Sequence, residues 1–377
     1  MSMDPAAWVE QAQKTLEQAR SQGLSLDLQG HGSKAFYGNS LDRPAQPLST
    51  LDYAGLVSYD PTELVVVVRA GTPISVLESA LAEHQQMLAF DPPQFQGPRG
   101  RGTVGGLVAT GLSGPRRLQA GACRDYVLGL TVLGADGELL RYGGTVMKNV
   151  AGYDMARLHT GGLGSLGLVL DVSLKVLPRP AATATVAMTV SESEALLLAN
   201  QSLAQPLPIV ATAYEAASGR LFIQLAGAQA AVRSAQALFA DRHSAASIQP
   251  DQANDFWISL RDQTHPAFQS PSDHHSLWRL SVPTTTPVLS DAAVLTEWAG
   301  GQRWVWSTEP AQALFERASA VGGHATCWRR GRAVGSEQPM RSVFSPLSPV
   351  LAQLHQRLKD ELDAARLFNP GRLGPQL

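Results

Sequence analysis

Apolar positions in the first half of the chain alternate between the spacing of a helix and the spacing of a strand. Asp4 and Pro5 can begin a helix, and four apolar residues follow them at helical spacing: Trp8, Ala12, Leu16 and Ala19. Residues 24–28 then alternate in the manner of a strand. The valines at residues 65–68 predict a strand that is buried on both faces. The start of the chain therefore predicts a helix followed by a sheet.

A second helix and three more strands are predicted up to residue 176. The helix starts at residues 72–73, and its apolar stripe consists of Ile74, Leu77 and Leu81. Residues 127–133 and 138–142 flank the Asp-Gly pair at 136–137, which predicts a tight hairpin. Residues 168–176 alternate as a closing strand.

The two prolines at residues 178–180 mark the best boundary between two domains, because glycine becomes rarer and the pattern changes after them. Beyond this point the order is strand, helix, strand, strand, helix, at residues 185–190, 192–203, 209–214, 221–225 and 228–239. A final helix is predicted over residues 350–367. We therefore expect an α+β chain with a first domain at residues 1–180 and a smaller antiparallel α+β domain at residues 181–377.

The length, charge and cysteine content of the chain exclude several classes of function. The length of 377 residues suits two domains, and the formal net charge of −2 gives no footprint for nucleic acid or an anionic membrane. Cys123 and Cys327 are too few for an iron–sulfur cluster or a four-thiolate zinc site, so we expect no metal. No apolar run approaches the roughly 18–20 residues that span a bilayer, and the first residues lack a signal-peptide pattern. We expect a cytoplasmic protein without a transmembrane segment.

Glycine is concentrated in one stretch of the chain. Residues 97–167 hold 18 of the 34 glycines, within segments that otherwise predict short strands and helix starts. Glycine at this density costs backbone entropy, so a ligand must approach the main chain closely or the backbone must adopt positive φ. Such segments can direct backbone N–H groups at a phosphate or a flat ring.

A smaller glycine loop, Gly30-His31-Gly32-Ser33-Lys34, directly follows the strand predicted at residues 24–28. It can form a nest of N–H donors for a pyrophosphate, to which the lysine adds charge. It lacks the Gly-Lys-Ser/Thr end of a Walker A loop and the Gly-x-Gly-x-x-Gly of a Rossmann fold. Alone, such a loop is more often a plain turn than a binding site.

Further segments follow this loop in a fixed order. They are Asp60-Pro61-Thr62-Glu63-Leu64, Gly102-Thr103-Val104-Gly105-Gly106, Lys148-Asn149-Val150-Ala151-Gly152-Tyr153-Asp154 and Gly164-Ser165-Leu166-Gly167. Over residues 1–180 this order resembles the FAD-binding domain of the vanillyl-alcohol oxidase and p-cresol methylhydroxylase (PCMH) type. The resemblance implies a two-subdomain FAD-binding fold followed by a cap domain that covers the flavin ring.

The same resemblance implies which residues bind FAD. The first glycine loop would hold the pyrophosphate, and the segment from Gly102 would wrap the cofactor. The implied FAD-binding residues are Gly30, His31, Gly32, Ser33, Lys34, Pro92, Gly102, Thr103, Val104, Gly105, Gly106, Ala109, Gly111, Asp125, Gly162, Gly164 and Leu168.

Some members of the family attach the flavin covalently, through a histidine at the end of the first glycine loop or a cysteine just before the second. Here Ser33 holds the loop position, and no cysteine directly precedes Gly102. We therefore expect non-covalent FAD, and we expect Cys123 to be a buried apolar residue.

Two segments near the C-terminus narrow the resemblance. Residues 368–372, Phe-Asn-Pro-Gly-Arg, are similar to the ending of flavin-linked 2-hydroxyacid dehydrogenases. The short second domain and residues 322–329 resemble the small flavin subunits of bacterial glycolate oxidases. Such subunits assemble with a larger flavoprotein and an iron–sulfur subunit, which suits a chain with too few cysteines for a cluster of its own. Peripheral contact with the inner membrane would then come through those partners.

The chemistry implied by the resemblance is hydride transfer from a small 2-hydroxy acid to the flavin, which takes glycolate to glyoxylate. The protein must hold the carboxylate and accept the hydroxyl proton, and His324, Arg329 and Asn369 are the candidate catalytic residues. Larger catalytic relatives carry Gly-Glu-His-Gly, whereas this chain has Gly322-Gly323-His324-Ala325. Two alternatives therefore stay open: a stand-alone FAD oxidoreductase for another 2-hydroxy acid such as D-lactate, and a non-catalytic flavin-binding assembly subunit.

Overall fold

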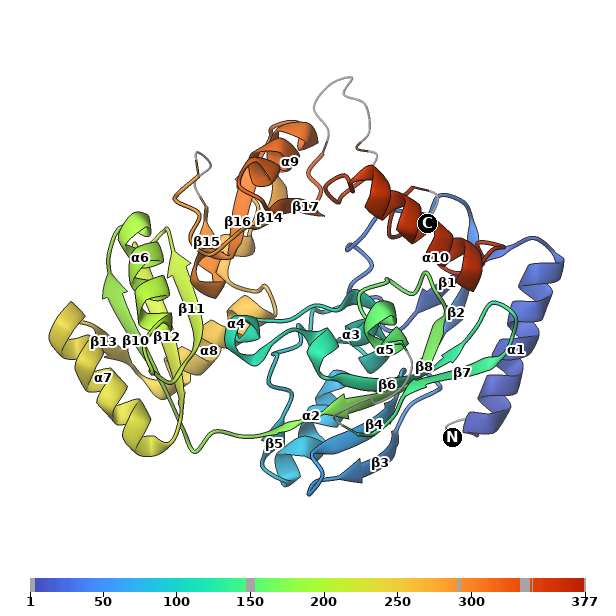
Figure 1. Ribbon diagram of the computed structural model, residues 1–377, viewed down its shortest axis with the longest axis horizontal. Helices are drawn as coiled ribbons and strands as arrows, with labels where there is room; N and C mark the ends of the chain where they lie inside the picture. The colour runs from blue at the N-terminus through green and yellow to red at the C-terminus, as the bar shows by residue number, and fades with distance from the viewer. Residues whose placement is uncertain (1–3, 147–152, 290–292, 333–339, 341, 376–377) are drawn as a thin grey trace. The chain divides into compact units, whose positions relative to one another are not determined.

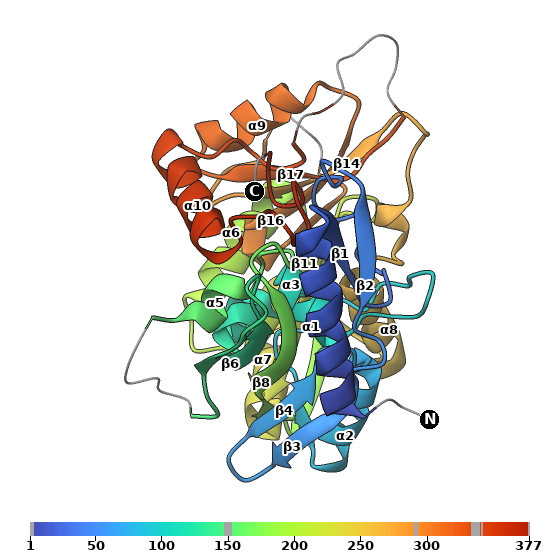
Figure 2. The same ribbon diagram turned by 90° about the vertical axis from the view of Figure 1, so that its right-hand side faces the viewer.

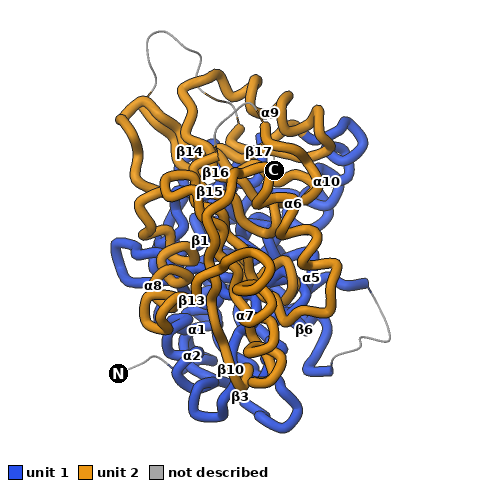
Figure 3. The backbone as a smooth tube through the Cα atoms, turned by 90° about the vertical axis from the view of Figure 1, so that its left-hand side faces the viewer, with its two compact units in different colours: residues 1–112, 122–178, 347–377 blue, residues 113–121, 179–346 orange. Residues whose placement is uncertain are grey.

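The computed structural model describes residues 4–146, 153–289, 293–332, 340 and 342–375 (Figure 1). The chain forms two compact units (Figure 3). Unit 1 consists of residues 1–112, 122–178 and 347–377, and unit 2 consists of residues 113–121 and 179–346. Of the predicted motif at residues 148–154, residues 148–152 lie outside the described residues.

Unit 1 contains a five-stranded antiparallel sheet in the order β3-β4-β8-β6-β7. The strands are β3 (Leu56–Asp60), β4 (Val65–Arg69), β6 (Val127–Leu133), β7 (Leu139–Gly143) and β8 (Leu168–Lys175). The predicted hairpin is confirmed, since β6 pairs with β7 and Gly137 has a φ of +89° in the turn. The predicted valine strand is β4, which pairs on both sides and has three buried valines at Val65, Val66 and Val68.

A two-stranded parallel sheet and several helices complete unit 1. The small sheet pairs β1 (Ser25–Gln29) with β2 (Ala45–Ser49), and β5 (Gln86–Met87) pairs with β9 (Leu177–Pro178). The helices are α1 (Pro5–Ser21), α2 (Ile74–Glu83), α3 (Val104–Thr110), α5 (Met155–His159) and α10 (Pro349–Leu362), with the 3-10 turn η1 (Cys123–Asp125). None of the helices within the described ranges is long and apolar enough to cross a membrane.

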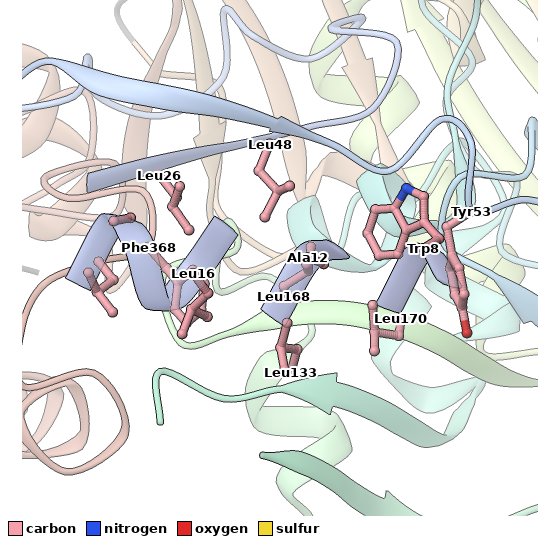
Figure 4. Close-up of a cluster of buried hydrophobic side chains, with 12 residues drawn as sticks. Trp8, Ala12, Leu16, Leu26, Leu48, Tyr53, Leu133, Leu168, Leu170 and Phe368 are labelled. Atoms are coloured by element: carbon pink, nitrogen blue, oxygen red, sulfur yellow. The ribbon is translucent and has the colours of Figure 1, made fainter. Parts of the chain in front are cut away.

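The core of unit 1 joins the first helix to both sheets (Figure 4). The apolar stripe predicted for α1 is buried against side chains of the small sheet and of β6 and β8: Leu26, Leu48, Leu133, Leu168 and Leu170. Figure 2 shows α1 beside β1 and β2. Leu367 and Phe368, close to the C-terminus, are buried in the same cluster.

Unit 2 is an eight-stranded antiparallel sheet in the order β13-β10-β12-β11-β15-β16-β14-β17. The strands are β10 (Ala182–Thr189), β11 (Ile209–Glu215), β12 (Arg220–Gly227), β13 (Ala246–Ile248), β14 (Ser276–Ser281), β15 (Leu295–Glu297), β16 (Gln302–Ser307) and β17 (His324–Arg329). The helices are α4 (Arg117–Ala120), α6 (Glu192–Leu203), α7 (Gln229–His243), α8 (Pro250–Arg261) and α9 (Ala311–Ala320), with the turns η2 (Pro266–Phe268) and η3 (Trp298–Gly300).

The compact units differ from the predicted division at residue 180 in two places. Residues 347–377 belong to unit 1, because Leu367 and Phe368 pack in its core. Residues 113–121 belong to unit 2, where the Trp298 indole N–H donates to the Gly114 carbonyl at 3.1 Å and the Arg117 guanidinium lies 4.7 Å from the indole ring. The final helix also ends at Leu362 rather than residue 367.

His159 gives unit 1 a specific sensitivity to acid. It is 5% exposed, its ring stacks on Tyr142 with 5.4 Å between ring centres, and burial lowers its pKa to about 4. Within the described ranges its Nε2 atom has no hydrogen-bond partner. An unfolded chain binds a proton here near pH 6.5, while the folded chain stays neutral until about pH 4.

We expect His159 to destabilise the fold as the pH falls from 6.5 towards 4. The free energy of unfolding should drop by about 2 kcal/mol between pH 7 and pH 5 from this group. Denaturant unfolding of the wild type and of His159→Gln at both pH values checks this, since the variant should lose that part of the pH dependence. Equal slopes in the two proteins would contradict it.

Candidate functional site

A pocket of about 750 Å³ lies within unit 1. This volume falls in the range of small-molecule sites. Four parts of the chain line it: residues 27–41, with Thr50 and Ala70 beside them; residues 98–110; residues 163–169; and the C-terminal pair Asn369 and Arg372. Segments from both ends of the sequence and from the glycine-rich middle therefore meet in one cavity.

The first glycine loop begins where β1 ends and supplies free backbone donors. Gly32 has a φ of +72°, and a Cβ atom on Gly30 would lie 2.4 Å from Thr103 Oγ1, so neither position accommodates a larger residue easily. Within the described part of the chain, no group accepts a hydrogen bond from the backbone N–H of His31, Gly32 or Ser33. Successive free N–H groups of this kind can bind an anion.

Cationic side chains add positive charge around the same loop. Lys34 is 8% exposed, and its ammonium lies 5.9 Å from the Phe95 ring. The Arg372 guanidinium donates to the carbonyls of Ala35, Tyr37 and Asn39 at 2.8–3.1 Å. It therefore fixes the chain that follows the loop while its charge stays at the pocket wall.

The second glycine segment packs helix α3 against the end of β4. The Gly105 N–H donates to the Ala70 carbonyl at 2.7 Å, and a Cβ atom on Gly105 would lie 2.9 Å from that of Ala70. Thr103 caps the helix by accepting from the Gly106 N–H at 3.2 Å. A Cβ atom on Gly106 would meet only this hydroxyl, at 3.3 Å, so the pocket is open at that position.

The third wall is held by side-chain bonds from Asn369. Its Oδ1 atom accepts from the Leu28 N–H at 2.8 Å, and its Nδ2 atom donates to the Leu163 carbonyl at 2.7 Å. Gly164 has a φ of +70°, and a Cβ atom there would lie 2.8 Å from Asn369 Nδ2. Both ends of the Asn369 amide are thus bonded to the backbone of opposite pocket walls.

Most of the predicted FAD-binding residues come together in this pocket. Those that line it are Gly30, His31, Gly32, Ser33, Lys34, Thr103, Gly105, Gly106, Ala109, Gly164 and Leu168. Asn369, predicted as catalytic, lines it as well. The sequence did not single out several others, namely Asp27, Gln29, Tyr37, Ser40, Leu41, Pro98, Arg99 and Arg372. Among these residues, Arg372 is the one that a sequence signal could have identified, because it ends the motif at residues 368–372.

Six predicted residues do not line the pocket, and their roles in binding FAD stay predictions. Val104 is buried inside α3, and Gly111 ends that helix with a φ of +59°. A Cβ atom on Gly102 would lie 2.9 Å from Lys34 Nζ. Asp125 accepts from the Ala122 N–H at 2.8 Å, and the Gly162 carbonyl accepts from Ser165. Pro92 is buried, and no hydrogen bond among the described residues explains its position.

The other two predicted catalytic residues lie on β17 of unit 2. His324 begins the strand, and partial burial followed by the positive charges of Arg279 and Arg117 lowers its pKa. Arg329 ends the strand, and its Nη2 atom donates to Gln263 Oε1 at 3.0 Å. Their catalytic roles stay predictions.

Cys123 is fully buried, as predicted. Burial raises the pKa of its thiol to about 12, so the reactive thiolate is absent at neutral pH.

The chain is similar to known proteins along almost its whole length. A family described as FAD binding domain matches residues 6–143. The glycolate oxidase subunit GlcE of Escherichia coli (strain K12) is 39% identical over 363 residues, which are 96% of this chain and 96% of that protein. The glycolate oxidase subunit GlcD of Bacillus subtilis is 45% identical over 78 residues, 21% of this chain and 17% of that protein. D-lactate dehydrogenase of Anaerostipes hadrus is 36% identical over 33% of this chain and 25% of its own length.

A solved structure of alkyldihydroxyacetonephosphate synthase has the same fold, with a TM-score of 0.64 at 13% identity over 96% of this chain and 74% of that one. The predicted α+β, PCMH-type fold is confirmed.

The residues of the pocket fit FAD, the cofactor that the matching domain indicates. The free N–H groups at residues 31–33 and the charge of Lys34 suit a diphosphate. At Gly106, which lines the pocket, the main chain carries no side chain that would keep a ligand away.

Filling the open position at Gly106 should exclude the cofactor. Its α-helical backbone tolerates any side chain, so we expect Gly106→Leu to fold but to lose at least tenfold in FAD affinity. Gly106→Ala, which adds one methyl group, should bind more tightly than the leucine variant. Flavin fluorescence titration of refolded apoprotein measures both, with circular dichroism as the folding check. A folded leucine variant with wild-type affinity would refute the placement of the pocket.

Proposed function

Because the chain belongs to the family of the glycolate oxidase subunit GlcE, we propose that it is the FAD-binding subunit of a complex that oxidises glycolate to glyoxylate. One observation carries this proposal: the identity to the E. coli subunit extends over 96% of both chains. The pocket of unit 1 supports it independently, since its donors and glycines suit FAD.

FAD bound in this pocket would supply the acceptor for the hydride that leaves the carbon bearing the substrate hydroxyl. The chain's own contribution begins with the first glycine loop. We infer that the N–H groups of residues 31–33 and the Lys34 ammonium bind the diphosphate. The close packing at Gly105 and Gly164 leaves no room for larger side chains, so at these two positions the pocket wall would present main chain to the cofactor. Cys123 is buried, and the proposed attachment of FAD is non-covalent.

We propose that His324 accepts the hydroxyl proton and that Arg329 holds the substrate carboxylate. A lowered pKa leaves the His324 imidazole neutral at pH 7, which is the state that a general base needs. The guanidinium of Arg329 can form two parallel bonds to a carboxylate. For Asn369 the contacts favour a positioning role, because both ends of its amide are bonded to the backbone.

Two of the relatives, GlcE and GlcD, are named as subunits of a glycolate oxidase. We propose that this chain assembles in the cytoplasm with a larger flavoprotein of that kind and with an iron–sulfur subunit, which would take the electrons onward. The stand-alone alternative rests on relatives named D-lactate dehydrogenase, whose matches cover 33% and 45% of this chain. That partial coverage favours the complex.

The first test is spectroscopic. The purified chain should be yellow, acid should release its FAD, and glycolate should bleach the flavin in the absence of air. Bleaching by D-lactate but not by glycolate would favour the stand-alone alternative. If neither glycolate nor D-lactate bleaches the flavin until the larger subunit is added, this chain is an assembly subunit. A folded chain that binds no flavin would refute the proposal.

We expect His324→Gln to slow anaerobic flavin reduction by about 10²–10⁴-fold without changing FAD occupancy, because it removes the base. In the wild type, the rate should rise with pH and reach its plateau with a midpoint below 6.5, since the pKa of His324 is lowered. Stopped-flow kinetics across pH 5–8 measure this. His274→Gln, at an exposed histidine of the same unit, is the matched control. Equal rates in the two variants would exclude His324 as the base.

A further inference from the structure

The most deeply buried side chain of helix α10 is a charged one, although apolar residues usually fill that place. All fourteen of its residues are described, and the one that is buried is Lys359, with 1% of its surface exposed. The apolar side chains of Val350, Leu351 and Leu354 are 47–68% exposed. Leu358 and Leu362 are partly buried, so the bonds of the lysine add to a small apolar contact.

Lys359 uses all three of its donors inside unit 1. The ammonium donates to Asp363 Oδ2 at 2.7 Å, to the Ser165 carbonyl at 2.6 Å and to the Phe368 carbonyl at 3.1 Å. An ammonium has three N–H bonds, so each one has a partner. One group thus joins α10, the third pocket wall at Ser165 and the C-terminal segment.

Asp363 organises the turn that follows the helix. Its side chain is 0% exposed. Its Oδ1 atom accepts from the Leu367 N–H and its Oδ2 atom from the Phe368 N–H, both at 2.9 Å. The carboxylate therefore ends α10 and directs residues 367–368 along β1, where the Leu26 N–H donates to the Leu367 carbonyl.

The next residues reach the pocket itself. The Asn369 backbone N–H donates to the Leu26 carbonyl at 3.0 Å, and its side chain joins Leu28 to Leu163. Arg372 then fixes residues 35–39 after the first glycine loop. Contacts that start at the buried ion pair therefore continue without a break to both glycine-rich walls.

We propose that the buried Lys359–Asp363 pair is a positioning element for the cofactor: it holds the first glycine loop and the loop at residues 163–167 at the spacing that FAD requires. This inference rests on the proposed FAD site. Neither Lys359 nor Asp363 is among the described residues that line the pocket, so the effect of the pair is transmitted through Ser165, Phe368 and Asn369.

The test is FAD affinity of the full-length apoprotein, measured by flavin fluorescence. We expect Lys359→Met and Asp363→Asn each to raise the Kd for FAD at least tenfold, because each leaves a buried partner uncompensated. The double variant Lys359→Met/Asp363→Asn should still bind more weakly than the wild type. Asp360→Asn is the matched control: it removes an exposed carboxylate of the same helix, paired with Arg366 at 2.5 Å, and should leave the Kd within twofold.

Amide hydrogen exchange of the apoproteins separates positioning from general stability. Exchange should become faster at residues 28–39 and 162–169 in Lys359→Met and remain unchanged in unit 2. If the pair only stabilises the fold, the variants will melt at lower temperature but keep a wild-type Kd and wild-type exchange in both loops, and the inference is wrong.

Asn369→Asp provides a second route if the ion-pair variants fail to fold. It keeps the bond from the Leu28 N–H and replaces the donor to Leu163 by an acceptor. It should raise the Kd for FAD at least tenfold, and an unchanged Kd would overturn the inference. If the wild type itself binds no FAD, both the proposed function and the inference fail. If the wild type binds FAD and the variants bind it equally well, only the inference fails.

Discussion

The close approach of neighbouring side chains to the glycine backbone around the unit 1 pocket is the constraint on which the rest of the site depends. At Gly30, Gly105 and Gly164, an added Cβ atom would lie within 3 Å of a neighbouring residue. The walls are therefore made largely of main chain, which supplies N–H donors in fixed positions at no cost in side-chain entropy. The Asn369 side chain then joins one wall to the next, and the Thr103 hydroxyl caps α3 within one of them.

This constraint explains why the cofactor half could be predicted from sequence and why its details could not. A glycine is visible in a sequence, and its clustering indicates close approach. The partner that it approaches is not visible. Gly102, Gly106 and Gly111 are indistinguishable as glycines in the sequence. In the structure, Gly102 leaves room for the Lys34 side chain, whereas Gly111 ends helix α3. Asp27 and Tyr37 line the pocket only because of where β1 and its loop place them.

The fold follows the same rule. Local signals were sufficient for α1, whose predicted cap Asp4 accepts from the Ala7 N–H at 3.1 Å, and for the β6–β7 hairpin. The return of residues 347–377 to unit 1 was beyond such signals, because it depends on contacts between positions more than 300 residues apart. The end of α10 likewise depends on Asp363, whose carboxylate satisfies two backbone N–H groups that a longer helix would bond internally.

The two units also differ in what their sequences can disclose about chemistry. In unit 1, function resides in backbone geometry, which tolerates wide variation elsewhere; the fold is shared at 13% identity with a synthase. In unit 2, the candidate groups are single side chains, His324 and Arg329, on a strand whose other residues pack in the core. Specificity for one hydroxy acid over another must come from such side chains, because FAD is common to all of them. Similarity over the whole length of the chain, rather than over the cofactor domain, is therefore the evidence that bears on substrate.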